Sequence, residues 1–275
     1  MIHIATVHHK NPFWVGIQRD YLDSYIKEEY KLYAYLDFKP QVDDKYIEKN
    51  FPGIDKSVSS KFDVVFSGDT KGSGGAFQHS QRLKTLYTNI LQSAKDEDII
   101  VFLDSDAFPL SEDIVKFIKE KLEKYSLVAV QRLENTGDRH PHPMFCVSTI
   151  KTWKKLHRLS GGNVWSLGPS GGDGGGIMEI GGGLLQTLNK NKIKWYKMKR
   201  SNVTNYHKVF FGVYENLIYH HGGGSRALRC RQDFQTYGGP QKYDISSTYQ
   251  KVKDKHKELL EEMVPNKNFY KQFLT

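Results

Sequence analysis

The chain has 275 residues, with 40 basic and 31 acidic side chains and a net charge of +9. Hydrophobic residues make up 38% and aromatic residues 13% of it, a composition that excludes disordered, collagen-like and coiled-coil proteins. A chain of this length can bury a sizeable core, and its two cysteines, Cys146 and Cys230, are too few for a disulfide framework.

Strands and helices are predicted to alternate over the first half of the chain, as in a sheet built by β-α-β crossovers. Residues 2–8 favour a strand over a signal peptide, because no basic segment precedes a long apolar one. Further strands are expected at residues 32–36, 62–66, 99–103 and 127–130, and helices at residues 14–26, 79–93 and 114–122. The predicted fold class is therefore α/β, with a mostly parallel, Rossmann-like sheet in a single α/β/α sandwich.

The second half of the chain differs in character. Residues 161–183 contain eleven glycines, which predict a loop that approaches other groups closely. A helix is expected at residues 184–188, a strand ends at the paired histidines near residue 220, and residues 249–275 predict one or two peripheral helices. No internal repeat, dividing linker or window of about 18 apolar residues occurs, so we expect one domain without a transmembrane segment.

The sharpest motif is a pair of carboxylates, Asp104 and Asp106, directly after the apolar strand at residues 99–103. Ligands of open α/β sheets bind outside the carboxyl ends of the strands. Two hard oxygen donors at that place suit Mg²⁺ or Mn²⁺, which keeps open positions for water and for phosphate oxygens. The motif therefore predicts a divalent cation and a diphosphate substrate.

The apolar strand that ends in Asp104-Ser105-Asp106 resembles the DxD motif of the GT-A class of nucleotide-sugar glycosyltransferases. The order of elements is similar over residues 1 to roughly 225. The resemblance implies a single GT-A-like domain at residues 1–275, with a nucleotide-sugar donor half at 1–110, an acceptor half at 111–230 and a helical tail at 231–275. It also implies that Asp106 binds the cation directly, while Asp104 contacts the donor ribose or the metal indirectly.

The same resemblance assigns donor-binding roles to residues of the first strands and the first loop. Two of them end the first strand and one follows the second, where the family holds base and ribose. Three others lie on the loop and helix that face the donor, where a basic group neutralises phosphate. Each has an alternative role as a turn, cap or surface residue. These candidates are Thr6, His8, Asp37, Lys71, Ser73 and His79.

An apolar strand ends in His220 and His221 and is followed by a glycine turn. Adjacent side chains of a strand point to opposite faces, so one of these histidines should face the site and the other the core. The resemblance implies that one of them, left open here, completes the metal site. Ser225 and Arg226, after the glycines, are candidates for pyrophosphate contacts.

Acceptor-side candidates lie in and around the glycine-rich segment. A carboxylate on a glycine-flanked loop can take the proton from an acceptor hydroxyl, which favours Asp173 as the catalytic base, with Glu179 as the alternative. Residues 138–147 suit a rim that shapes the acceptor pocket, and Trp165 is a candidate for stacking on a sugar ring. A retaining enzyme would need no base at Asp173.

The sequence thus predicts a cytoplasmic, metal-dependent glycosyltransferase. It would move a hexosyl or pentosyl group from a nucleotide-diphosphate sugar, with UDP favoured, to a hydroxyl of a glycan or glycoconjugate. A nucleotidyltransferase that makes nucleotide sugars is the first alternative, but a glycine-rich loop does not follow the first strand. A non-enzymatic basic protein that binds nucleic acid or glycan is the second. Nucleic acid is not expected, because the basic residues are mixed with acidic ones along the chain.

Overall fold

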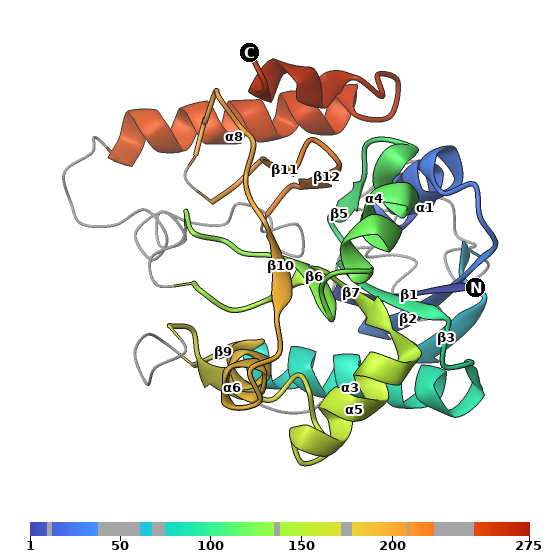
Figure 1. The fold of residues 1–275 in the computed structure, drawn as a ribbon. Helices are drawn as coiled ribbons and strands as arrows, with labels where there is room; N and C mark the ends of the chain where they lie inside the picture. The colour runs from blue at the N-terminus through green and yellow to red at the C-terminus, as the bar shows by residue number, and fades with distance from the viewer. Residues whose placement is uncertain are drawn as a thin grey trace.

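A seven-stranded sheet forms the centre of the protein in the computed structural model (Figure 1). The structure describes residues 1–9, 13–37, 61–67, 75–134, 138–171, 178–207, 209–222 and 245–275. The strand order is β10-β6-β7-β4-β1-β2-β3, and β7 alone runs antiparallel to its neighbours. The strands are β1 (Ile2–His9), β2 (Tyr30–Asp37), β3 (Val64–Ser67), β4 (Ile99–Asp104), β6 (Leu127–Val130), β7 (His142–Thr149) and β10 (Trp195–Met198). The predicted α/β class with a mostly parallel sheet is confirmed.

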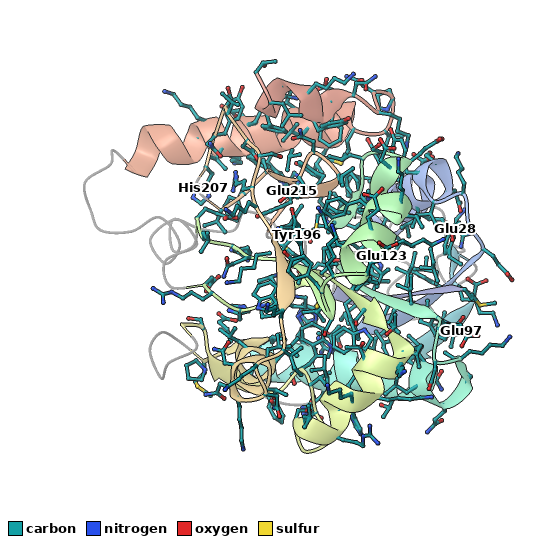
Figure 2. All side chains as sticks on the ribbon, in the orientation of Figure 1. Glu28, Glu97, Glu123, Tyr196, His207 and Glu215 are labelled. Atoms are coloured by element: carbon teal, nitrogen blue, oxygen red, sulfur yellow. The ribbon has the colours of Figure 1, made fainter. Side chains whose placement is uncertain are left out.

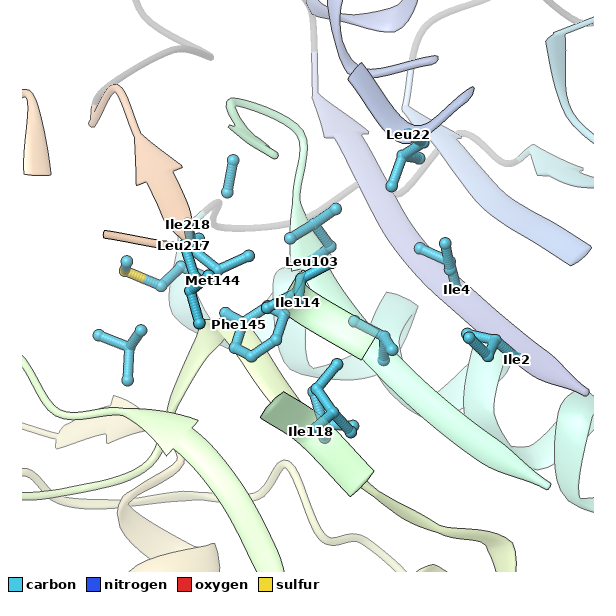
Figure 3. Packing of buried hydrophobic residues seen from close by; sticks show 14 of the residues in the cluster. Ile2, Ile4, Leu22, Leu103, Ile114, Ile118, Met144, Phe145, Leu217 and Ile218 are labelled. Carbon is cyan, nitrogen blue, oxygen red and sulfur yellow. The ribbon is translucent and has the colours of Figure 1, made fainter. Parts of the chain in front are cut away.

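Helices cover both faces of this sheet, so two hydrophobic clusters form, one on each side. The period of two along β1 distributes its side chains between them: Ile2 and Ile4 join one cluster, and Ala5 and Val7 the other. The first cluster is shown in Figure 3. It includes residues of α1 (Phe13–Tyr25) and α4 (Asp113–Leu122), and the second includes residues of α3 (Ala76–Ser93), α5 (Ile150–Leu159) and α6 (Gly182–Lys190).

A third hydrophobic cluster lies beside α1, away from the central sheet. It is built on a small antiparallel sheet of β11 (Gly212–Tyr214), β12 (Ile218–His220) and β5 (Ala107–Pro109). The C-terminal elements α8 (Ile245–Glu262) and η2 (Phe269–Phe273) pack there, with Leu259 and Phe269 fully buried. The predicted peripheral helices at the C-terminus are therefore confirmed, and they cover a core of their own.

A two-stranded sheet of β8 (Leu167–Pro169) and β9 (Met178–Ile180) packs against the start of α6. The backbones meet here without room for side chains. A Cβ atom on Gly168 would lie 2.4 Å from the backbone nitrogen of Gly183, and one on Gly182 would lie 2.1 Å from the carbonyl oxygen of Gly168. These glycines therefore have a packing role, which the glycine-rich sequence predicted as close approach.

The carboxyl ends of the parallel strands lie together at one end of the molecule. In Figure 2, Glu28 and Glu97 lie at the end where β1 begins, and His207 lies at the opposite end. Trp165 was a candidate for sugar stacking, but it is fully buried between α3 and α5 and packs on Phe102 and Trp153, so that prediction is wrong. Of the helices within the described ranges, none combines the length and apolar character needed to cross a bilayer.

Candidate metal and donor site

The strand order creates a topological switch point between β1 and β4. From β1 the chain passes to β2 and β3 on one side, then crosses to β4 on the other. The connections on the two sides of a switch point diverge, so a crevice opens at the carboxyl ends of the two central strands. The register pairs Val7 of β1 with Asp104 of β4, which puts the end of β4 at this crevice.

Three potential metal ligands, Asp104, Asp106 and His220, meet at this edge. One ligand atom from each lies within 4.8 Å of the others. His220 Nε2 lies 3.5 Å from Asp106 Oδ1 and 3.9 Å from Asp104 Oδ2, which is too long for hydrogen bonds. On an octahedral cation with bonds of about 2.1 Å, neighbouring ligands lie about 3.0 Å apart and opposite ones about 4.2 Å. The spacing and the donor set therefore fit a divalent cation.

The pairing of two three-residue strands, β5 and β12, brings His220 to the carboxylates. β5 begins at Ala107, the residue after Asp106, and pairs antiparallel with β12 so that Ala107 lies opposite His220. The backbone N–H of His221 also donates to the carbonyl oxygen of Asp106, at 3.0 Å. The pairing thus brings together groups more than 110 residues apart in the sequence.

A buried glutamine of α1 fixes the turn between the two carboxylates. Gln18 Nε2 donates to the carbonyl oxygen of Asp104 at 2.7 Å and to that of Ala107 at 2.9 Å. The side chain is 1% exposed. Sequence reasoning missed Gln18, although a polar residue among the apolar positions of a predicted helix was the available signal.

The surroundings of Asp104 raise the pKa of its carboxyl group. Burial, together with the neighbouring charge of Asp106, raises the pKa of Asp104 to about 6, against the opposing charges of His220 and Arg132. Two buried carboxylates repel each other, and a cation between them removes that cost. His79, in the first turn of α3, has its Nε2 atom 3.8 Å from Asp104 Oδ1. Burial, helped by the nearby Arg82 and His9, lowers the pKa of His79 to about 4, so its ring is neutral at pH 7.

The other donor-side candidates lie at different depths. Thr6 and His8 are fully buried, and Thr6 Oγ1 lies 3.4 Å from His8 Nε2. Burial lowers the pKa of His8 to about 4. Asp37, at the end of β2, forms an ion pair of 2.7 Å with the buried Arg82 and also contacts His9.

The two adjacent histidines face different surroundings, as the alternation of a strand requires. His220 lies beside the carboxylates, whereas the ring of His221 packs on Trp14 and Phe211 of the third cluster. His221 Nδ1 lies 3.0 Å from the Tyr219 hydroxyl, and its Nε2 lies 2.5 Å from His256 Nδ1 on α8. Of the two candidates, the structure brings only His220 to the carboxylates.

Glu179, the alternative base, lies half-buried on β9, in the two-stranded sheet beside α6. The remaining candidates lie outside the described residues: Lys71, Ser73, Asp173, Ser225 and Arg226.

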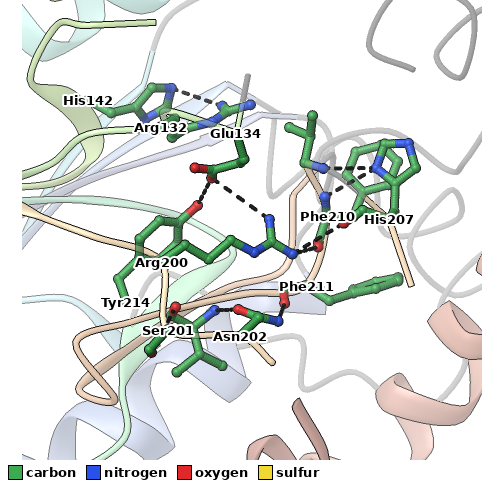
Figure 4. A network of polar contacts seen from close by, with 12 residues as sticks. Arg132, Glu134, His142, Arg200, Ser201, Asn202, His207, Phe210, Phe211 and Tyr214 are labelled. Carbon is green, nitrogen blue, oxygen red and sulfur yellow. Dashed lines mark hydrogen bonds and ion pairs between the residues drawn. The ribbon is translucent and has the colours of Figure 1, made fainter. Parts of the chain in front are cut away.

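A polar network borders the site on the side of β6 and β7 (Figure 4). Arg132 Nη1 lies 3.1 Å from His142 Nε2. Glu134 accepts a hydrogen bond from the Tyr214 hydroxyl and pairs with Arg200, which also donates to the carbonyl oxygen of Phe210 at 2.8 Å. Burial and the charge of Arg132 lower the pKa of His142 well below its usual value. Sequence reasoning placed His142 on an acceptor-side rim. It missed Arg132 and Arg200, because neither belongs to a recognisable sequence motif.

No protein-family model matches the sequence, and no curated protein resembles it significantly in sequence. Solved structures with a similar fold include a putative nucleotide-diphospho-sugar transferase from Desulfovibrio desulfuricans G20, at 9% identity and TM-score 0.44, over 94% of this chain and 96% of that one. A second is the mannosyltransferase PcManGT from Pyrobaculum calidifontis, in complex with GDP-Man and Mn²⁺, at 12% identity and TM-score 0.41, over 71% of this chain. A third is a 4-diphosphocytidyl-2C-methyl-D-erythritol synthase from Anaerococcus prevotii, at 11% identity and TM-score 0.41, over 72% of this chain and 86% of that one.

The chain matches 54% of the length of the mannosyltransferase. Identities of 9–12% with TM-scores below 0.5 are too low for an activity, a substrate or a metal to be transferred from these proteins. The α/β sandwich with two carboxylates at the end of β4 is nevertheless the arrangement that the GT-A resemblance of the sequence implied.

Proposed function

We propose that the protein is a metal-dependent glycosyltransferase that moves a sugar from a nucleotide-diphosphate sugar to a hydroxyl of a glycan or glycoconjugate. The observation that carries this proposal is the group of Asp104, Asp106 and His220 at the switch point of the sheet. A cation held there by two carboxylates and one imidazole keeps positions free for diphosphate oxygens. An imidazole ligand favours Mn²⁺ over Mg²⁺, which takes mostly oxygen ligands.

When bound, the cation would supply a Lewis acid that stabilises the negative charge developing on the leaving diphosphate. The chain's own groups prepare that position. Gln18 holds the backbone between the carboxylates, and His79 offers a neutral ring nitrogen beside Asp104. Lys71, Ser73, Ser225 and Arg226 are proposed to add contacts to the diphosphate, and Thr6, His8 and Asp37 to surround the nucleoside.

An inverting reaction also needs a base for the acceptor hydroxyl. Asp173 is proposed for this role and Glu179 as the alternative, so Asp173→Asn should reduce turnover more than donor affinity. Turnover that is unchanged in both Asp173→Asn and Glu179→Gln would reject a base at either position.

A nucleotidyltransferase remains the alternative, because it would use the same cation site. The sequence that follows β1 disfavours it, since residues 8–12 read His-His-Lys-Asn-Pro and contain no glycine. The two activities break different bonds of a nucleotide sugar, so they need different co-substrates and give different products. A glycosyltransferase releases the nucleoside diphosphate, whereas a nucleotidyltransferase run with pyrophosphate releases the nucleoside triphosphate and a sugar phosphate.

The first test is calorimetric titration of UDP, GDP, dTDP and CMP, each with and without Mn²⁺. We expect one nucleoside diphosphate to bind only with the metal, and Asp106→Asn to abolish that binding. Asp254→Asn, which changes an exposed aspartate on α8, is the matched control. Failure of every nucleotide to bind the wild type in the presence of Mn²⁺ would reject the proposal.

A further inference from the structure

The buried Arg132 and the half-buried His142 form a pair in which both facing groups are hydrogen-bond donors. Arg132 is 8% exposed, and its Nε atom has no hydrogen-bond partner among the described residues. Its Nη1 atom lies 3.1 Å from His142 Nε2. On the other side of the same ring, the backbone N–H of Met144 donates to His142 Nδ1, also at 3.1 Å.

The imidazole ring cannot accept from both neighbours. A guanidinium nitrogen and a backbone N–H only donate, whereas a neutral histidine has one acceptor nitrogen and one N–H. With Nδ1 accepting from Met144, the Nε2 atom carries a hydrogen and faces a second donor on Arg132. Glu134 contacts Tyr214 and Arg200 through its Oε1 atom, and no hydrogen bond or ion pair joins it to Arg132 or His142 (Figure 4). Among the residues that the structure describes, the pair therefore lacks an acceptor.

The backbone holds this unbalanced pair in place. The β6–β7 register shifts after Ala129, so that Cys146 lies opposite Ala129 but His142 lies opposite Val130. The irregularity places His142 opposite Val130, the last residue of β6, and Arg132 follows Val130 by two residues. The backbone N–H of Gln131 donates to Met198, and the Gln131 side chain donates to the carbonyl oxygen of Arg139, at 2.9 Å. The pair is thus built into the sheet.

The pair lies near the candidate metal site, on the β7 side of β4. β7 lies next to β4, on the side opposite to β1 and β2. The ring centroids of His142 and His220 are 6.3 Å apart. A diphosphate bound at the metal site, with its nucleoside over β1 and β2, would have the acceptor on the side of β6 and β7.

We propose that Arg132 and His142 form a subsite for an oxyanion, a phosphate or carboxylate group carried by the acceptor. One anionic oxygen beside Arg132 Nη1 and His142 Nε2 would accept from both groups, while Nδ1 keeps its bond to Met144. The buried guanidinium would gain a counter-ion at the same time. This inference rests on the proposed transferase function and narrows its acceptor to an anionic glycan or glycoconjugate.

The test is titration of inorganic phosphate into the metal-free protein at constant ionic strength, followed by calorimetry and by the shift of Tm. We expect saturable binding to the wild type and at least a tenfold weaker affinity in Arg132→Met. Arg158→Met, which changes an exposed arginine on α5, is the matched control and should bind phosphate like the wild type. The removal of one donor from the conflict should also leave the Tm of ligand-free Arg132→Met unchanged or higher.

Three results would overturn the inference. The first is absence of saturable phosphate binding to the wild type, or equal binding to the wild type and Arg132→Met. The second is a ligand-free Arg132→Met whose Tm falls well below that of the wild type, which would give Arg132 a structural role. Arg132→Lys, titrated in parallel as a milder change, should bind phosphate at least fivefold more weakly than the wild type.

The third concerns the source of the oxyanion. Phosphate binding should persist at saturating UDP and Mg²⁺, the metal chosen because Mn²⁺ precipitates with phosphate. Loss of phosphate binding under those conditions would assign the pair to the donor diphosphate and overturn the acceptor subsite. Failure of UDP and the other nucleotides to bind would reject the transferase proposal separately, since the metal-free titration does not depend on it.

Discussion

Asp106→Asn should have opposite effects on the stability of the metal-free and metal-loaded protein. In the metal-free protein, burial and Asp106 together raise the pKa of Asp104 from 3.8 to about 6. Burial contributes more to this shift than Asp106 does, so the repulsion that the substitution relieves is on the order of 1 kcal/mol. Because the amide has nearly the shape of the carboxylate, we expect the metal-free Tm to stay unchanged or rise.

The metal-loaded protein should show the reverse. A cation at 100 times its Kd stabilises the folded state by about 2.7 kcal/mol, which corresponds to a rise in Tm of about 5–10 °C for a chain of this size. Loss of one of three ligands that weakens the cation about a hundredfold leaves about 0.4 kcal/mol, or roughly 1 °C. The variant should therefore gain almost nothing from Mn²⁺.

The assay is thermal unfolding of wild type, Asp106→Asn and Asp254→Asn, each with EDTA and over a series of Mn²⁺ concentrations. Asp254→Asn should keep the full metal-dependent rise. The reasoning would be refuted by an Asp106→Asn variant that unfolds several degrees earlier in EDTA, or by one that keeps the rise with Mn²⁺.

Three further predictions concern the scaffold around the site. Although burial alone would raise it, the N-terminal ammonium group and neighbouring donors lower the pKa of Asp98 to about 2. The stability that this interaction provides is present above pH 4 and lost as the pH falls toward 2. After allowance for solvent screening, Asp98→Asn should therefore lower the free energy of unfolding by about 1–2 kcal/mol at pH 7 and by little near pH 2. Urea unfolding from pH 7 to pH 2 tests this, and a difference between variant and wild type that stays constant with pH would show that the ion pair is irrelevant. Gln18→Leu removes the Gln18 donor from two backbone carbonyl groups, so it should lower the free energy of unfolding by about 2–4 kcal/mol and weaken Mn²⁺ binding. Equal Mn²⁺ affinity of variant and wild type in calorimetry would show that Gln18 does not position Asp104. Gly168→Ala should lower the free energy of unfolding by at least about 2 kcal/mol, because its Cβ would meet the backbone of Gly183; a neutral result in denaturant would contradict the close packing.

Local sequence patterns predicted five strands of the central sheet closely, β1, β2, β3, β4 and β6, because most of them are apolar and largely buried. The strand expected at residues 127–130 is β6, and the helix expected at residues 79–93 ends with α3 at Ser93. Asp104 and Asp106 were found for the same reason, since a carboxylate pair after a buried strand stands out against its surroundings.

Long-range pairing was beyond the reach of these patterns. β5 and β12 contain three residues each, too few for a period of two to be recognised, yet their register decides that His220 and not His221 lies beside the carboxylates. Arg132 and His142 meet only because the β6–β7 register is irregular. No local signal in the sequence encodes such a shift.

The direct junction between Asp106 and β5 has a consequence for insertions and deletions. One residue added or removed between Asp106 and Ala107 would either turn the side chains of β5 to the opposite face of the small sheet or displace the carboxylates from His220. A change of length after Leu110, where the chain leaves β5 for the start of α4, would leave that junction intact. A library of single-residue insertions across residues 104–113 should therefore lose metal-dependent stabilisation sharply up to Pro109 and tolerate additions near Ser111.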